Sequence, residues 1–170
     1  MSLTRYLLVV ACAFAFTSCK DKVKEERKIA LREFMHGNAG DAELTAAMEK
    51  ARATVGEFLT ALQKPAPGQS GFIVRKTFPT KDATRQQILL VNFITYDGAL
   101  LHGKVDDNTF QPGSGVPPDG VVSFSPSEIA DWMFNENGKT VGGYMLRVFK
   151  TKFPEDWEKA RYGERIQFKD

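Results

Sequence analysis

A nearly unbroken run of apolar and β-branched residues, Gln87 to Thr95, constrains the fold of this chain more than any other segment. A strand that is apolar on both faces is typical of the interior of a sheet that is covered on both sides. The Asp97-Gly98 pair follows the run, and these residue types tolerate the positive φ of a tight hairpin turn. The chain is therefore predicted to return over residues 99–105 as an antiparallel neighbour.

Two other segments show strand patterns. Residues 72–78 alternate between apolar and polar side chains and end at Pro79. Residues 121–124 are the second segment, and they follow an irregular stretch, residues 111–120, that holds three glycines and three prolines. These segments extend the predicted antiparallel sheet.

A long helix is predicted before the sheet. Asp41 is a suitable N-cap, and the helix should run to about Gln63 because Pro65 ends it. Apolar residues recur between them at spacings of three and four, which places one apolar stripe along the helix: Leu44, Ala47, Met48, Ala51, Val55, Phe58, Leu59 and Leu62. Gly56 lies in the interior of this predicted helix, and it indicates that the helix backbone approaches the sheet closely at this point.

Ser125-Pro126-Ser127-Glu128 is the clearest local signal of the C-terminal half. A serine N-cap, a proline at the first helical position and a following glutamate match a capping box. The motif predicts a short helical turn through Ile129 and Asp131, followed by half-buried residues 132–134.

The remaining glycine and proline positions predict one more hairpin and short C-terminal helices. Asn137-Gly138 suits a second hairpin turn before residues 139–141. Gly142-Gly143 precedes a short predicted helix over residues 144–150, and Pro154 opens a final amphipathic segment. The predicted fold is a single α+β domain over residues 41–170, with a long N-terminal helix on an antiparallel sheet of four to five strands and short C-terminal helices.

The first 18 residues have the order of a lipoprotein signal peptide. Arg5 precedes the apolar run from Tyr6 to Phe16, and small residues then lead to Cys19. The run is too short to cross a bilayer, because a spanning helix needs about 20 residues. A cut before Cys19 would leave a lipidated cysteine and a charged tether over residues 19–40. We therefore expect an exported protein that is held in the bacterial cell envelope by lipid at Cys19.

Charge and cysteine content exclude several kinds of site. Removal of the signal takes away Arg5 and no acidic residue, which leaves 22 basic and 21 acidic side chains. This balance argues against a nucleic-acid surface, which is usually strongly basic. The only cysteines are Cys12, in the signal, and Cys19, so the exported domain should have no disulfide and no thiolate metal site. We predict no metal and no cofactor.

A set of motifs resembles a known family. The residues that carry the resemblance are Gly120–Phe124, Glu128–Met133, Asn137–Lys139, Gly142–Tyr144 and Arg147. They are similar to the signature of the YegJ-like domain of unknown function 2314, and the resemblance covers roughly Asp41 to Phe149. It implies a compact α+β domain, several members of which look like exported bacterial lipoproteins, with no established reaction.

Each candidate residue has two interpretations. Asp131 and Arg147 could form an internal ion pair, or Arg147 could bind a carboxylate or phosphate of a ligand through its planar donors. Trp132 and Tyr144 could frame a recognition pocket or pack beneath the hairpin. Gly142 and Gly143 could simply form a turn.

Three functional hypotheses follow. The first is a non-enzymatic module that binds a protein or peptide, with a surface formed by Asp131, Trp132, Gly142, Gly143, Tyr144 and Arg147. The second is an envelope hydrolase with Asp131, His102 and Arg147 as its polar centre, although the sequence has no known nucleophile or metal motif. The third is a structural spacer. No residue is assigned a catalytic role.

Overall fold

The computed structural model describes residues 25, 26, 29, 34, 41–80, 86–106, 115–160 and 162–170. The chain divides into two compact units, residues 1–33 and Phe34–Asp170, and the second unit holds every element named below. The predicted signal peptide and Cys19 lie outside the described residues, as does most of the predicted tether. No helix in the described part is long and apolar enough to cross a membrane.

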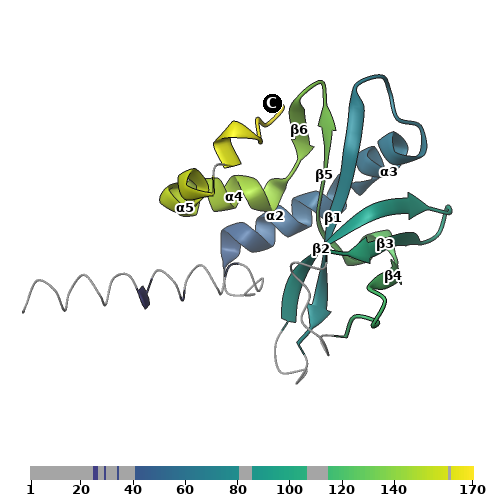
Figure 1. Ribbon diagram of the computed structural model, residues 1–170, viewed down its shortest axis with the longest axis horizontal. Coiled ribbons are helices and arrows are strands. Elements are labelled where there is room, and N and C mark those ends of the chain that lie inside the picture. Colours follow the sequence, from purple (N-terminus) through teal and green to yellow (C-terminus); the bar gives the residue numbers. More distant parts are fainter. Residues whose placement is uncertain are drawn as a thin grey trace, which may run out of the picture. The chain divides into compact units, whose positions relative to one another are not determined.

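The second unit is built on an antiparallel sheet, as predicted (Figure 1). Its strands are β1 (Gln69–Pro79), β2 (Gln86–Tyr96), β3 (Leu101–Val105), β4 (Val121–Phe124), β5 (Ile129–Glu136) and β6 (Lys139–Gly142). They lie in the order β4-β3-β2-β1-β5-β6, and every neighbouring pair is antiparallel. Within the described residues the sheet therefore has six strands, one more than the upper limit predicted.

The additional strand is β5, where the sequence pattern predicted a helical turn. The capping box forms, with Ser125 N donating to Glu128 Oε2 at 2.8 Å, but it starts only a 3₁₀ turn over Pro126–Glu128. From Ile129 the chain is extended and pairs with β1. Residues 129–134 are all buried, so sheet pairing and burial override the local helix signal.

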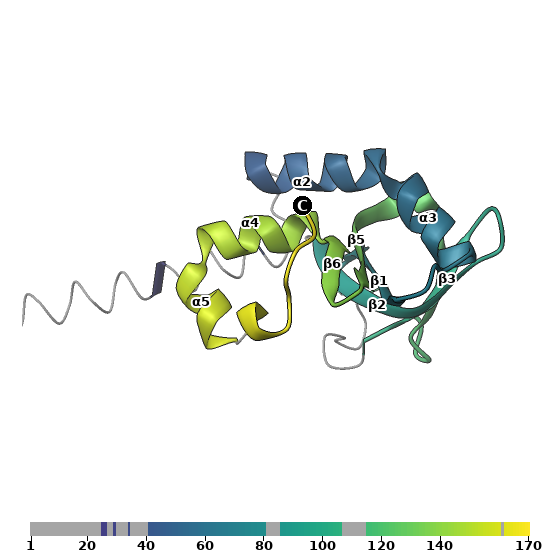
Figure 2. The ribbon, with the colours of Figure 1, turned by 90° about the horizontal axis from the view of Figure 1, so that it is seen from above.

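The predicted helix over residues 41–63 is confirmed in position but is broken into α2 (Ala42–Ala53) and α3 (Val55–Gln63). Asp41 caps α2 by accepting from Glu43 N and Leu44 N, each at 3.1 Å. The break is at Thr54, whose hydroxyl donates to Lys50 O at 2.8 Å and also lies 3.1 Å from Tyr144 Oη. Figure 2 shows both helices above one face of the sheet.

The run that dominated the sequence forms β2, an interior strand between β1 and β3. Its expected cover on both faces is incomplete, since Phe93 is 83% exposed. Phe93 also has a φ of 54° and lies where the register between β2 and β3 shifts. A bulge at this point turns the side chain out of the sheet.

The C-terminal helices match the prediction, as α4 (Tyr144–Lys152) and α5 (Pro154–Lys159). α4 packs beside α2 and β5. After a 3₁₀ turn at Tyr162–Glu164, the last residues run parallel to β6. Thr140 N donates to Gln167 O at 2.6 Å, and Lys169 N donates to Thr140 O at 2.9 Å.

Candidate functional site

Asp131 is a fully buried carboxylate that caps α4 from a neighbouring strand. Its Oδ1 accepts from Trp132 N at 2.9 Å and from Tyr144 N at 3.1 Å, and its Oδ2 accepts from Met145 N at 3.0 Å. The first N–H groups of a helix have no partner within the helix, so an external acceptor satisfies them. Asp131 therefore joins β5 to the start of α4.

Burial raises the pKa of Asp131 to about 6, because a carboxylate loses hydration inside the core. The positive charge of Arg75 and the three backbone N–H groups oppose this shift. Arg75 lies opposite Asp131 on β1. The carboxyl group therefore changes charge near neutral pH, while it remains an acceptor for the helix.

The raised pKa predicts a pH-dependent stability. The folded state holds the Asp131 proton up to about pH 6, whereas the unfolded chain releases it near 3.8. The contribution of Asp131 to the unfolding free energy is fully present below pH 3.8 and is lost as pH rises through 6. We expect wild type to lose about 2 to 3 kcal/mol of unfolding free energy relative to Asp131→Asn between about pH 4 and 7.

Urea denaturation of both proteins at several pH values measures this difference. Other carboxylates whose pKa values are lowered by hydrogen bonds, such as half-buried Asp41 and exposed Glu128, are common to both proteins, and their contributions cancel. A difference between the two proteins that stays constant over this pH range would contradict the prediction.

Trp132 lies beside Asp131 in the chain and is also completely buried. Its indole N–H donates to Ala51 O at 2.9 Å, and its ring packs against Phe58 and Tyr144. The sequence predicted a half-buried residue, and the structure places the side chain in the core beneath α2 and α3. Trp132 thus supports the neighbouring surface without being part of it.

Arg147 contacts the C-terminal segment and not Asp131. Its Nε donates to Gly142 O at 3.3 Å, and its Nη2 donates to Lys169 O at 2.8 Å. The guanidinium carbon lies 4.3 Å from the ring centre of Phe168. Asp131 and Arg147 therefore hold different segments, and the contacts described for each do not include the ion pair considered from the sequence.

Two adjoining hollows lie between α3, β6 and the C-terminal segment, and together they form what we call the α3–β6 groove. Their volumes are about 470 and 400 Å³. Glu57, Val141 and Lys169 line both hollows. The first is lined further by Gly56, Thr60, Ala61, Lys64, Ala66, Gln69, Phe134 and Glu136, and the second by Lys50, Gly142, Tyr144, Arg147 and Asp170.

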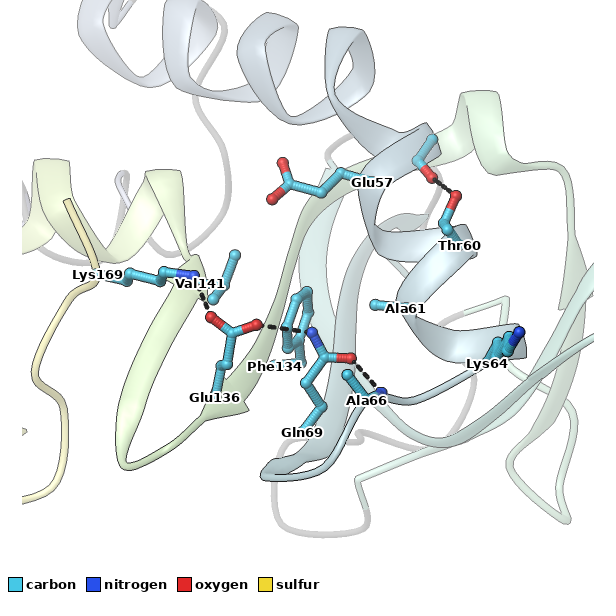
Figure 3. Close-up of a pocket in the computed structure, with 11 residues that line it drawn as sticks. Glu57, Thr60, Ala61, Lys64, Ala66, Gln69, Phe134, Glu136, Val141 and Lys169 are labelled. Carbon is cyan, nitrogen blue, oxygen red and sulfur yellow. Dashed lines mark hydrogen bonds and ion pairs between the residues drawn. The ribbon is translucent and has the colours of Figure 1, made fainter.

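The groove carries charges of both signs (Figure 3). Glu136 accepts from Gln69 Nε2 at 2.8 Å and pairs with Lys169, so these three side chains hold one wall together. Lys50 lies with its Nζ 5.2 Å from the ring centre of Tyr144. Within the part of the chain that the structure describes, Lys50 and Lys64 have no carboxylate partner.

The groove includes some predicted candidates and adds others. Gly142, Tyr144 and Arg147 line it, whereas Asp131, Trp132 and Gly143 are buried and are absent from its lining. Lys50 and Glu57 were not predicted as site residues. Charged residues on the helix face opposite an apolar stripe are usually solvent-exposed, so their pattern does not indicate a site.

Gly56 also differs from its prediction. It was expected to mark a close approach of helix and sheet, but a Cβ atom built there would meet nothing within 4 Å. The residue lies instead on the lining of the groove.

His102 lies on β3, and β2 and β1 separate it from Asp131 on β5. Three strand spacings of about 4.8 Å amount to about 14 Å across the sheet. The imidazole of His102 contacts two other residues, Asp97 and Ser123. Asp131, His102 and Arg147 therefore do not converge on one centre.

No group of three or more His, Cys, Asp or Glu side chains that could hold a metal ion occurs among the described residues.

Comparison with known proteins gives one match. A family model described as an uncharacterized protein conserved in bacteria (DUF2314) matches residues 41–168. No curated protein and no solved structure matches the chain. The matched range includes the groove except for Lys169 and Asp170.

Proposed function

Because the chain belongs to the DUF2314 family, whose description gives no activity, we propose its function from its own groove. The domain is a binding module that holds an extended, acidic peptide segment of a protein partner in the α3–β6 groove. The observation that carries this proposal is the pair of adjoining hollows with two lysines that lack a carboxylate partner among the described residues.

The shape and charge of the groove favour such a ligand. Two adjoining hollows that share Glu57, Val141 and Lys169 suit an elongated chain better than a compact molecule. Lys50 and Lys64 are exposed at its two ends, and Arg147 keeps further N–H donors beyond the two it uses for backbone carbonyls. Carboxylates of a peptide would pair with these cations, while Glu57 between them selects against uniformly acidic sequences.

The two other hypotheses have less support. A hydrolase centred on Asp131, His102 and Arg147 has less support because two strands separate His102 from Asp131 in the sheet, and Arg147 on α4 contacts the C-terminal segment. A structural spacer requires no hollow surface and gives no reason for the charged groove.

Site-specific photocrosslinking in the native bacterium tests the binding module. A photoreactive amino acid at Lys64, in the groove, should give a discrete crosslinked partner. The same substitution at Lys159, an exposed lysine on α5, is the matched control and should give none. Lys50→Glu should reduce the Lys64 product at least about tenfold, because it reverses a charge at the contact. Equal products at both positions, or none, would overturn the proposal.

We also propose that the domain is exported and lipid-anchored through Cys19. The order of Arg5, the apolar run and the small residues before Cys19 supports this. Metabolic labelling with an alkyne fatty acid should mark the wild-type protein and the Cys12→Ser variant, and it should not mark Cys19→Ser. Labelling that survives in Cys19→Ser would show that the lipid is attached elsewhere, and an unlabelled wild type would show that the protein carries no lipid.

A further inference from the structure

β3 and β4 lie at the side of the sheet opposite β6 (Figure 1). Three polar side chains meet there, from the β2–β3 turn, β3 and β4. His102 Nε2 lies 2.9 Å from Asp97 Oδ2, and His102 Nδ1 lies 2.8 Å from Ser123 Oγ. Asp97 belongs to the hairpin turn, His102 to β3 and Ser123 to β4. The three residues form a continuous hydrogen-bonded chain from a carboxylate through an imidazole to a hydroxyl.

The turn fixes the carboxylate and, through it, the tautomer of the imidazole. Asp97 Oδ1 accepts from Ala99 N and Leu100 N, each at 2.8 Å, which leaves Oδ2 for His102. An ionised carboxylate can only accept, so Nε2 of His102 carries a proton. In the neutral imidazole Nδ1 is then the acceptor, and it faces the hydroxyl of Ser123.

The register of β3 and β4 holds His102 and Ser123 side by side. They are paired residues, and Val105 N donates to Gly120 O at 2.9 Å three residues farther along the same ladder. Because hydrogen-bonded and non-hydrogen-bonded pairs alternate, His102 and Ser123 form a non-hydrogen-bonded pair, in which side chains are closest. For the same reason Ser123 N–H points away from β3, toward the edge of the sheet.

These side chains lie on the face of the sheet away from the core. Their strand neighbours Leu101 and Phe124 are buried, while the side chains of His102 and Asp97 are 38% and 53% exposed. Ser123 is itself exposed, so a reagent in solution can reach it.

We propose that Ser123 is a nucleophilic serine that accepts an acyl group from small activated esters, with His102 as its general base. Ser123 Oγ attacks the ester carbonyl while its proton moves to His102 Nδ1. The C–O bond to the leaving group then breaks, and the proton passes from Nδ1 to the departing oxygen. A water molecule repeats the sequence on the acyl-serine and releases a carboxylic acid.

The positions of Asp97 and of the Ser123 backbone N–H indicate their roles in the reaction. Asp97 touches no reacting atom, so it is a positioning residue that acts through His102. Ser123 N–H, on the side away from β3, is a donor for the oxyanion that forms on the attacked carbonyl. The open surroundings favour small acyl groups, and this activity is independent of the α3–β6 groove.

Acylation by p-nitrophenyl acetate, followed by mass spectrometry of the modified peptides, tests the proposal on the full chain. Ser127 is the internal control, because it is also exposed but has its hydroxyl paired with Ser125 and not with a histidine. General-base catalysis contributes about 100-fold or more, so Ser123 should be acylated at least about tenfold faster than Ser127. His102→Gln should reduce the rate at Ser123 to that at Ser127, with the urea midpoint unchanged. Equal rates at the two serines, or no effect of His102→Gln, would overturn the proposal.

Asp97→Asn tests the positioning role separately. The asparagine Oδ1 should stay with Ala99 N and Leu100 N, which need an acceptor, and its amide NH2 then faces His102. Nε2 must now accept, so the proton moves to Nδ1 and the imidazole can no longer take the proton of Ser123. We expect the loss of Ser123 acylation together with a tautomer change in the ¹⁵N NMR signals of His102. An unchanged tautomer with unchanged acylation would show that Asp97 has no such role.

Discussion

Asp131→Ala should be less stable than Asp131→Asn by about 3 kcal/mol, because an unsatisfied buried donor costs about 1 to 3 kcal/mol. Asparagine keeps the Oδ1 that accepts from Trp132 N and Tyr144 N, and it loses only the acceptor of Met145 N. Alanine removes all acceptors and leaves a cavity as well. Urea denaturation of both variants gives the difference in unfolding free energy.

The comparison of these two variants is chosen because neither can ionise at this position. Wild type alone carries the cost of a buried charge above about pH 6, which would offset part of the loss in a direct comparison with alanine. The difference between alanine and asparagine should therefore be the same from pH 4 to pH 8. A difference below about 1 kcal/mol would mean that water replaces the carboxylate as the acceptor for α4.

The elements that the sequence predicted correctly depend on neighbouring residues. Asp41 caps the helix that follows it, and Asp97-Gly98 and Asn137-Gly138 form turns between strands adjacent in the chain. The side-chain chemistry of such signals acts within a few positions, so a sequence motif is sufficient to find them.

The incorrect predictions depend on contacts between distant residues. The capping box at Ser125 indicates where a helix can start, but the pairing of residues 129–136 with β1 decides that the chain extends. The break at Thr54 is accompanied by a contact to Tyr144, 90 positions away. Nothing in the local pattern of residues 41–63 reports that contact.

The candidate site was only partly predicted, because some of its residues come together through contacts between distant parts of the chain. Gly142, Tyr144 and Arg147 were found because they belong to a motif of closely spaced residues. Lys50 and Glu57 reach the groove only through the packing of α2 and α3 against the sheet. Ser123 reaches His102 only through the register of β4 on β3, and these two strands are not adjacent at a tight turn in the sequence.

The second large effect that we expect is a loss of stability when Gly142, in the Gly142-Gly143 pair, is replaced by alanine. At Gly142 the backbone φ is +76°, and a Cβ atom would lie 2.4 Å from Trp132 O and 2.7 Å from two ring carbons of Trp132. Trp132 cannot move easily, since its indole N–H is held by Ala51 O and its carbonyl accepts from Gly143 N at 2.8 Å. Positive φ costs a non-glycine residue about 1 to 2 kcal/mol, and overpacking adds about 1 to 3 kcal/mol. We expect Gly142→Ala to lower the unfolding free energy by about 3 kcal/mol or more.

Gly143→Ala is the matched control for backbone strain. Its φ of +66° is similar, but the nearest atom to a Cβ there is Phe168 Cε1 at 3.3 Å, part of a side chain near the C-terminus. The variant should therefore lose only about 1 to 2 kcal/mol, the cost of the positive φ. Equal losses in the two variants would show that strain alone explains the double glycine. A much larger loss for Gly142→Ala would show that Gly142 is required because the Trp132 backbone and ring lie against it, which makes this half of the double glycine a packing requirement of the core beneath the groove.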